Sequence, residues 1–174
     1  MSYSLYDASV PLFRNMLANL SHFLDKAEAH AAETGGATVD YGQARLAPDM
    51  HPFIRQIQMA SDAAKGGAGR LAGVAPPSMA DDEETFDQLK ERIAKTLAFV
   101  ESLKAEQFAG REDATIELAF PNRTMTFTGR DFLTNFTLPN FLFHVTTAYA
   151  VLRNQGVPLG KMDYLAGAQM VPAA

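Results

Sequence analysis

The sequence contains no cysteine and no tryptophan among its 174 residues. Without cysteine, the chain cannot form disulfides, use a thiolate nucleophile or bind zinc through sulfur. It has no uninterrupted apolar run near the ~18 residues that mark a membrane-spanning helix, so no membrane partner is expected. Basic residues are also scarce, because 15 lysines and arginines stand against 20 acidic residues and give a net charge of -5. Phosphate binding needs a concentrated basic surface, so this balance argues against nucleic acid as the partner.

The N-terminal segment, residues 1–13, has neither a basic start nor a continuous apolar core, so it does not resemble a signal peptide. We therefore expect a cytoplasmic protein. With 47% hydrophobic residues, the chain is long enough to bury one substantial core. It shows no internal repeat and no low-complexity linker, so we expect a single domain over residues 1–174.

Three segments carry apolar residues at the spacing of helices that pack against other helices. They cover about residues 5–33, 50–71 and 81–103. In the first, Pro11 either kinks the helix or marks its true first turn, because proline lacks the N–H group of an internal hydrogen bond. The seam residues are Tyr6, Val10, Phe13, Leu17, Leu20, Leu24 and Ala27 in the first segment, Met50, Ile54, Ile57, Ser61, Ala64, Ala68 and Leu71 in the second, and Phe86, Leu89, Ile93, Val100 and Leu103 in the third.

The second and third helices carry signals at their ends. Asp49 is a candidate cap for the second helix, and Pro52 suits its first turn. The glycines at positions 66, 67 and 69 let a neighbouring helix approach closely, although each weakens the helix by about 1 kcal/mol. The acidic run 81–84 is predicted to open the third helix, because negative charge is favourable at a helix N-terminus. Residues 37–49 are predicted to be a connector with at most one short helical turn, and residues 73–80 a loop.

Residues 114–127 change to an alternating pattern. Apolar residues at 116, 118 and 120 precede Pro121-Asn122-Arg123, and apolar residues at 125 and 127 follow it. This pattern predicts a two-stranded hairpin with a short turn. Because an isolated hairpin is only marginally stable in water, we expect it to lie against the helices.

The last helical segment begins at Thr128 and is the richest in aromatic residues. Thr128 and Asp131 resemble a capping box, Pro139 interrupts the segment, and Gly156 ends it. The tail beyond Gly156 has no helical period. It is expected to pack over the bundle or over a partner subunit through Leu159, Tyr164, Leu165 and Met170.

The four histidines form two pairs. His22 and His30 lie among charged residues, so both are expected on the surface. His51 lies near the start of the second helix and His144 in the middle of the last helix. In a four-helix bundle, two such positions can converge at one end of the core.

A short polar strip surrounds His144 within an apolar helix. It consists of Asn140, His144 and Thr147, with the aromatic Tyr149 beside it. Burying an imidazole and an amide costs free energy unless each finds a partner. The strip therefore marks either a ligand cavity or a core network that satisfies itself.

Three segments and the hairpin end MTFTG closely resemble a bacterial family of uncharacterised function. The segments are residues 4–31, 45–65 and 138–165, so the resemblance covers nearly the whole chain. The family is grouped with the DinB/YfiT-like proposed metalloenzymes, which are four-helix bundles and often homodimers. The resemblance implies an all-α, up-down four-helix bundle with a small β-hairpin before the last helix, and a homodimer.

Metal-binding members of that wider group use three histidines, one from the second helix and two from the fourth. The two on the fourth helix are four residues apart and share a face, and a catalytic zinc or nickel needs about three protein ligands. His144 matches the first fourth-helix position, but the second position is Ala148. His51 lies near the second-helix position. Asp49 or Asn140 would have to supply a third ligand, although the spacing does not require it, so the triad is incomplete.

Two functional hypotheses follow. The first is a structural or ligand-binding bundle, in which a small, partly apolar molecule occupies a cavity lined by Asn140, His144, Thr147 and Tyr149. The second is a divalent-metal-dependent transferase or hydrolase of the thiol-transferase type, with zinc or nickel on His51 and His144. We prefer the first because two histidines fall short of the usual ligand count. The sequence has no phosphate loop, no serine elbow and no paired carboxylates in an apolar context, so other chemistries lack support.

Overall fold

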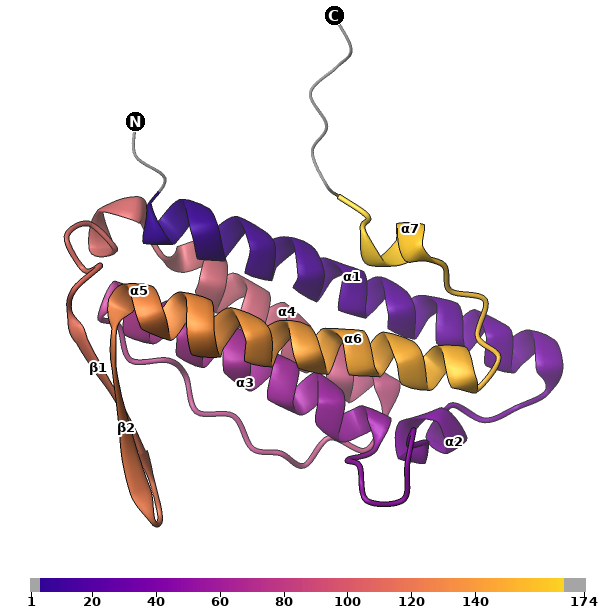
Figure 1. Ribbon diagram of the computed structural model, residues 1–174. Helices are drawn as coiled ribbons and strands as arrows, with labels where there is room; N and C mark the ends of the chain where they lie inside the picture. Colours follow the sequence, from indigo (N-terminus) through magenta and orange to yellow (C-terminus); the bar gives the residue numbers. More distant parts are fainter. Residues whose placement is uncertain (1–3, 168–174) are drawn as a thin grey trace, which may run out of the picture.

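Four long helices form the body of the protein in this computed structural model, which describes residues 4–167 (Figure 1). They are α1 (Leu5–Thr34), α3 (Phe53–Ala72), α4 (Phe86–Ser102) and α6 (Leu138–Asn154). The shorter elements are α2 (Thr38–Gln43), the 3-10 turn η1 (Ala105–Gln107), α5 (Gly129–Asp131), the π-helical segment η2 (Phe132–Thr137), α7 (Lys161–Tyr164), and the strands β1 (Thr115–Phe120) and β2 (Arg123–Thr128). The predicted helical bundle with a small hairpin before the last helix is confirmed. None of the described helices combines the length and hydrophobicity needed to cross a membrane.

The helix directions follow the order up, down, down, up. Phe53 and Phe86 are the first residues of α3 and α4, and their ring centroids lie 5.6 Å apart, so these two helices start at the same end. The crossover segment, residues 73–85, connects the end of α3 to the start of α4 and runs back along the outside of the bundle (Figure 1). An extended chain covers about 3.3 Å per residue, so this segment can span the ~30 Å rise of a helix as long as α3. The four-helix bundle therefore has a crossover connection in place of strict up-down alternation.

Capping residues explain where the helices begin. Ser4 caps α1 in a reciprocal box with Asp7, so Pro11 lies inside the helix and not in its first turn. Thr85 caps α4 in a similar box with Gln88. The start of α3 differs from the prediction, because the helix begins at Phe53 after Pro52 and has no side-chain cap. The expected cap at Asp49 is therefore absent.

The acidic run 81–84 precedes α4 and does not form its first turn, which corrects the prediction. Glu83 and Asp81 bind Arg92, whose side chain is only 1% exposed, with nitrogen–oxygen distances of 2.9 and 3.0 Å. Asp62 of α3 binds the same guanidinium at 2.7 Å. A buried guanidinium is tolerated only when it is paired and hydrogen-bonded. The acidic run thus fastens the crossover segment to the bundle.

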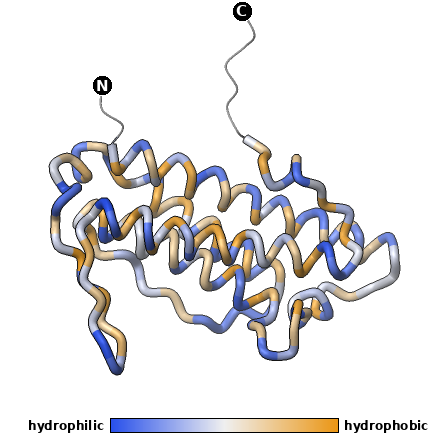
Figure 2. Tube along the Cα trace, viewed as in Figure 1, coloured by the Kyte–Doolittle hydropathy of each residue, from blue (hydrophilic) through white to orange (hydrophobic). Residues whose placement is uncertain are grey.

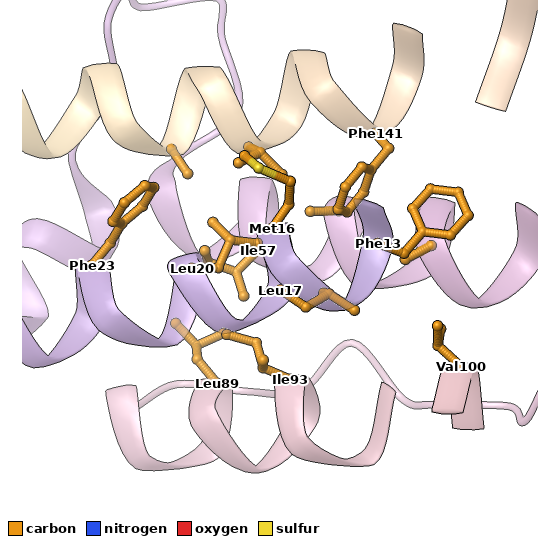
Figure 3. Close-up of a cluster of buried hydrophobic side chains, with 14 of the residues drawn as sticks. Phe13, Met16, Leu17, Leu20, Phe23, Ile57, Leu89, Ile93, Val100 and Phe141 are labelled. Atoms are coloured by element: carbon orange, nitrogen blue, oxygen red, sulfur yellow. The ribbon is translucent and has the colours of Figure 1, made fainter. Parts of the chain in front are cut away.

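The core lies along the axis shared by the four long helices. The hydrophobic positions face inward and the hydrophilic positions face outward along each helix (Figure 2). Phe13 of α1 and Phe141 of α6 meet edge to face at 5.0 Å, and Ile57 of α3 lies further along the same core, beside Leu20 (Figure 3). The predicted seam residues are buried with few exceptions, and burial of this kind contributes about 1.5–3 kcal/mol for each large side chain.

The hairpin contacts the bundle at its base and extends away from it at its tip (Figure 1). The strands pair from Thr115 with Thr128 to Phe120 with Arg123, so Pro121 and Asn122 form the turn. Ile116 and Leu118 are buried at 5% and 8% exposure, whereas Phe120 is 42% exposed. The expectation that the hairpin lies against the helices therefore holds for its base only.

The last helical segment is continuous but changes its winding before Pro139. Thr128 Oγ1 accepts a hydrogen bond from the Asp131 N–H at 3.1 Å, which supplies one half of the predicted capping box. The π-helical segment η2 follows and ends at Thr137. The helix then continues as α6, which begins with Leu138 and Pro139. Pro139 cannot donate an internal hydrogen bond, and the π-helical winding lies directly before it.

The tail after Gly156 packs over the bundle, as one of the two expectations stated. Leu159 is 3% exposed, and the ring of Tyr164 lies 6.0 Å from that of Tyr149. Leu165 is 41% exposed. Met170 lies outside the described residues.

Candidate functional site

A surface cavity of about 370 Å³ lies between α3, the η2–α6 segment and the hairpin. Its walls are mostly apolar, and several polar side chains converge on it. This combination is typical of small-molecule sites. The lining residues are Met59, Asp62, Ala63, Gly66, Gly67 and Arg70 of α3, Leu118 and Phe120 of β1, Phe132, Phe136 and Thr137 of η2, and Asn140 and His144 of α6.

Small residues of α3 create the space. The α3 lining positions recur at steps of three and four, which places them on one helix face. A β-carbon added to Gly67 would collide with the methyl group of Thr137, so glycine is what allows η2 to lie against α3. The predicted close approach at the glycine run is confirmed here. Arg70 lies at the exposed rim and donates from Nη1 to the Gly66 carbonyl at 2.9 Å.

Thr137 is the least satisfied polar group of the cavity. It is 2% exposed, and its Oγ1 has no hydrogen-bond partner within the described part of the chain. It lies in the π-helical segment, and such segments are frequent at functional sites. A buried hydroxyl without a partner costs about 1–3 kcal/mol. The Thr137 side chain packs against Gly67, so the folded protein bears this cost beside the cavity.

His144 is held by Gln56, which does not line the cavity. Its Nδ1 lies 2.9 Å from Oε1 of Gln56, and Nε2 of Gln56 donates to the carbonyl of His51 at 3.1 Å. Burial, with smaller contributions from His51 and Arg55, lowers the pKa of His144 to about 4. The imidazole is therefore neutral at pH 7.

The predicted polar strip is divided between two places. Asn140 and His144 both line the cavity. Thr147 donates to the carbonyl of Phe143 at 2.7 Å and lines a neighbouring shallow depression instead. Tyr149 faces α1 and α7, where its ring centroid lies 5.8 Å from that of Phe23.

Two residues of this region, Thr137 and Gln56, were not predicted from the sequence. Thr137 lies three residues before Asn140 and extends the same helix face, so the spacing was a usable signal. Gln56 is next to Ile57 of the predicted seam and is 2% exposed. Nothing in the local pattern distinguishes it from a surface glutamine.

The remaining histidines lie away from the cavity. His22 binds Asp163 at 2.9 Å, so it joins α1 to α7 as well as contacting solvent. A hydrogen bond from the Gly160 N–H, together with His22 and Lys26, lowers the pKa of Asp163 to about 2. His30 stacks on Tyr41 with ring centroids 6.3 Å apart. Both histidines have structural contacts near the surface.

The donor set does not fit a three-ligand metal centre. Ala148 is fully buried at the position where the wider group places its second α6 histidine, so that ligand is missing. His51 is exposed and lies before α3 begins. Within residues 4–167, no three histidine or acidic side chains converge as a metal site would require. A catalytic zinc needs about three protein ligands, and the side chains around His144 do not supply them.

The fold and the site together define the class of protein: a four-helix bundle of the DinB-like type with a cavity beside its last helix. Residues 5–165 match the family described as "Domain of unknown function (DUF1993)", so the chain belongs to this family. The crystal structure of a DinB family member protein from Shewanella denitrificans is similar, with 40% sequence identity and a TM-score of 0.90. That similarity covers 98% of this chain and 96% of the other. No curated protein matches the sequence.

Proposed function

We propose that the protein binds a small, largely apolar molecule in the cavity between α3, η2 and the hairpin. The observation that carries this proposal is the cavity itself, with largely apolar walls into which His144 brings a polar group. Asn140 adds an amide that makes no hydrogen bond to any described residue. Phe132 and Phe136 stack at 5.9 Å and supply an aromatic wall. An aromatic or aliphatic ligand would cover these rings and satisfy the polar groups.

A thermal-shift screen with neutral aromatic compounds tests this proposal. Ala63→Leu fills the cavity from α3, and Ala94→Leu adds the same side chain at an exposed position of α4. Compounds that raise the melting temperature of the wild type are expected to lose their effect on Ala63→Leu and to keep it on Ala94→Leu. Absence of any binding compound, or equal effects on both variants, would overturn the proposal.

A divalent-metal-dependent transferase or hydrolase, with zinc or nickel on His51 and His144, is the alternative that the resemblance implies. The donor set gives it less support than the cavity gives to binding. Elemental analysis of protein purified without chelator, beside the His51→Ala, His144→Ala double variant, compares the two. One metal ion per chain that disappears in the double variant would reverse our preference.

We also propose that the protein is a cytoplasmic homodimer. The support is an exposed apolar surface beside the cavity, with Phe143 at 55% and Leu46 at 41% exposure around a shallow depression. Exposed apolar patches of this kind are common at protein interfaces. Light scattering at several concentrations should give a dimer mass for the wild type and a monomer mass for Phe143→Glu. Val39→Glu, at a position with 57% exposure on α2, is the matched control.

A further inference from the structure

The orientation of the Gln56 amide is determined by its two contacts. Its Nε2 lies 3.1 Å from the carbonyl oxygen of His51, and its Oε1 lies 2.9 Å from Nδ1 of His144. The reversed amide would place Oε1 against the His51 carbonyl, and two acceptors would then face each other. An amide oxygen can only accept a hydrogen bond, so Nδ1 of His144 must be the donor.

This donor role fixes the tautomer of His144. His144 is only 9% exposed, and burial disfavours the charged form of its imidazole. A neutral imidazole carries one N–H group, and here it is on Nδ1. Nε2 therefore carries a lone pair and acts as a hydrogen-bond acceptor.

The part of the ring that Gln56 does not hold, which includes Nε2, is the part available to the cavity. His144 lines the cavity, whereas Gln56, which holds the Nδ1 edge, does not. No described residue forms a hydrogen bond with Nε2. Nε2 of His144 is thus a hydrogen-bond acceptor that receives no hydrogen bond from the described residues.

His144 contributes a buried acceptor to the cavity. The amide of Asn140 can donate or accept, so it suits either kind of ligand. Arg70 can only donate, but it lies at the exposed rim and its Nη1 is used by the Gly66 carbonyl. Nε2 of His144 can only accept. Asp62 is also an acceptor and lies at the same cavity, where Arg92 and Lys65 hold its carboxylate. The fixed groups therefore favour a ligand that donates.

We infer that the His51 carbonyl and Gln56 hold His144 as the Nδ1–H tautomer, and that the cavity selects a neutral, largely apolar ligand with an O–H or N–H donor. This inference rests on the proposed binding function. Gln56 is a positioning residue, because it acts on the ligand through His144. Phenols and indole-type molecules are the ligand class that combines such a donor with a flat apolar body.

The tautomer is measured directly by nitrogen-15 NMR of the histidine side chains at pH 7, with the resonances of His144 assigned through the His144→Phe variant. We expect a protonated Nδ1 and an unprotonated Nε2 in the wild type. Gln56→Leu, checked for folding by its thermal melt, should lose this pattern because Nδ1 no longer has an acceptor. A protonated Nε2 in the wild type, or an unchanged pattern in Gln56→Leu, would overturn the inference.

Ligand selection is tested with 2-naphthol and 2-methylnaphthalene, in which a hydroxyl donor is replaced by a methyl group of similar size. The affinity ratio of the two compounds should favour naphthol more in the wild type than in His144→Phe, by on the order of tenfold. If both compounds bind and the ratio is the same in the two proteins, the selection by His144 is wrong while the cavity remains a binding site. If neither compound binds, and the thermal-shift screen also finds no ligand, both proposals fail.

Discussion

The polar groups on the two sides of α6 differ in how they are hydrogen-bonded. On the face toward α1 and α7, Asn19 donates to the carbonyls of Tyr164 and Ala166 at 2.8 and 3.1 Å, and Asp163 is bound by both His22 and Lys26. On the face toward α3, Asn140 and His144 bring polar groups to a cavity, and Thr137 buries an unpartnered hydroxyl beside it. The first face is closed by the tail of the chain, and the second is left open. Because buried polar groups are normally hydrogen-bonded, this difference separates a face whose polar groups are satisfied within the fold from one that keeps polar groups for the proposed ligand.

The largest effect is expected when the closed face loses an aromatic side chain. Phe23 is fully buried, and its ring centroid lies 5.8 Å from Tyr149 and 6.5 Å from Tyr164. Phe23→Ala should lower the free energy of unfolding by about 3–5 kcal/mol, through lost transfer energy and the cavity left behind. Urea unfolding gives this value. Phe143→Ala, at a side chain that is 55% exposed, is the control and should change it by less than about 1 kcal/mol.

Acidification should reduce the free energy of unfolding at a different pH for each face. Between pH 6.5 and about 4, the unfolded chain protonates His144 while the folded protein does not, so stability falls as the pH falls. The two pKa values limit this loss to about 3 kcal/mol. Unfolding measured from pH 7 to 4 should show it in the wild type and not in His144→Phe. A wild type with constant stability over this range would show that His144 titrates normally.

The closed face should respond at a lower pH. The pKa of Asp163 is lowered to about 2, so its carboxylate stabilises the folded protein above the ordinary value of 3.8, and this stability is lost as the pH falls between 3.8 and 2. Asp163→Asn should remove that lower step and leave the His144 step unchanged. Chemical unfolding at pH 2 to 4 measures the difference. The same curve for both proteins would contradict the assignment.

Removal of a paired amide on the closed face should have a smaller effect. Asn19 is 4% exposed, and its amide satisfies two carbonyls of the tail. Asn19→Ala should cost about 1–3 kcal/mol, because those carbonyls then lose a buried donor. Asn154→Ala, at an exposed position of α6, is the matched control. Equal melting temperatures for the two variants would contradict the role given to Asn19.

The smallest effect on stability is expected at the open face, and its sign should be reversed. Thr137→Val keeps the shape of the side chain and removes a hydroxyl that has no partner among the described residues. The free energy of unfolding should stay constant or rise by up to about 1 kcal/mol, because a polar group is no longer buried unpaired. A marked loss of stability would show that this hydroxyl is satisfied in the folded protein.

Much of the fold could be predicted from the sequence because burial imposes a period on each helix. The seams of α1, α3 and α4 repeat every three or four residues, and the alternation in residues 114–127 indicated the hairpin. The direction of α4 could not be predicted, because a long connection permits either direction. The role of the acidic run also depends on Arg92, and a buried arginine looks like a surface residue in one-dimensional sequence.

The candidate site was predicted in part for a similar reason. Asn140 and His144 were identifiable as polar residues in an apolar helix. Gln56 contributes to the site through a contact with His144, 88 positions away in the chain, so no local pattern indicates it. Tyr149 was assigned to the same strip by its position in the sequence, but it faces the other side of α6.

The crossover segment also determines where the covalent chain can be interrupted. Each side of Pro76-Pro77 retains two of the four long helices, and the ion pair between Arg92 and Asp62 connects the two parts at 2.7 Å. Pro77 and its following residue are exposed, as is usual for sites that tolerate cleavage or insertion. Fragments 1–76 and 77–174, produced together, should therefore assemble and co-purify. The bundle is therefore a candidate for a split protein, in which the assembly of the two fragments restores the fold.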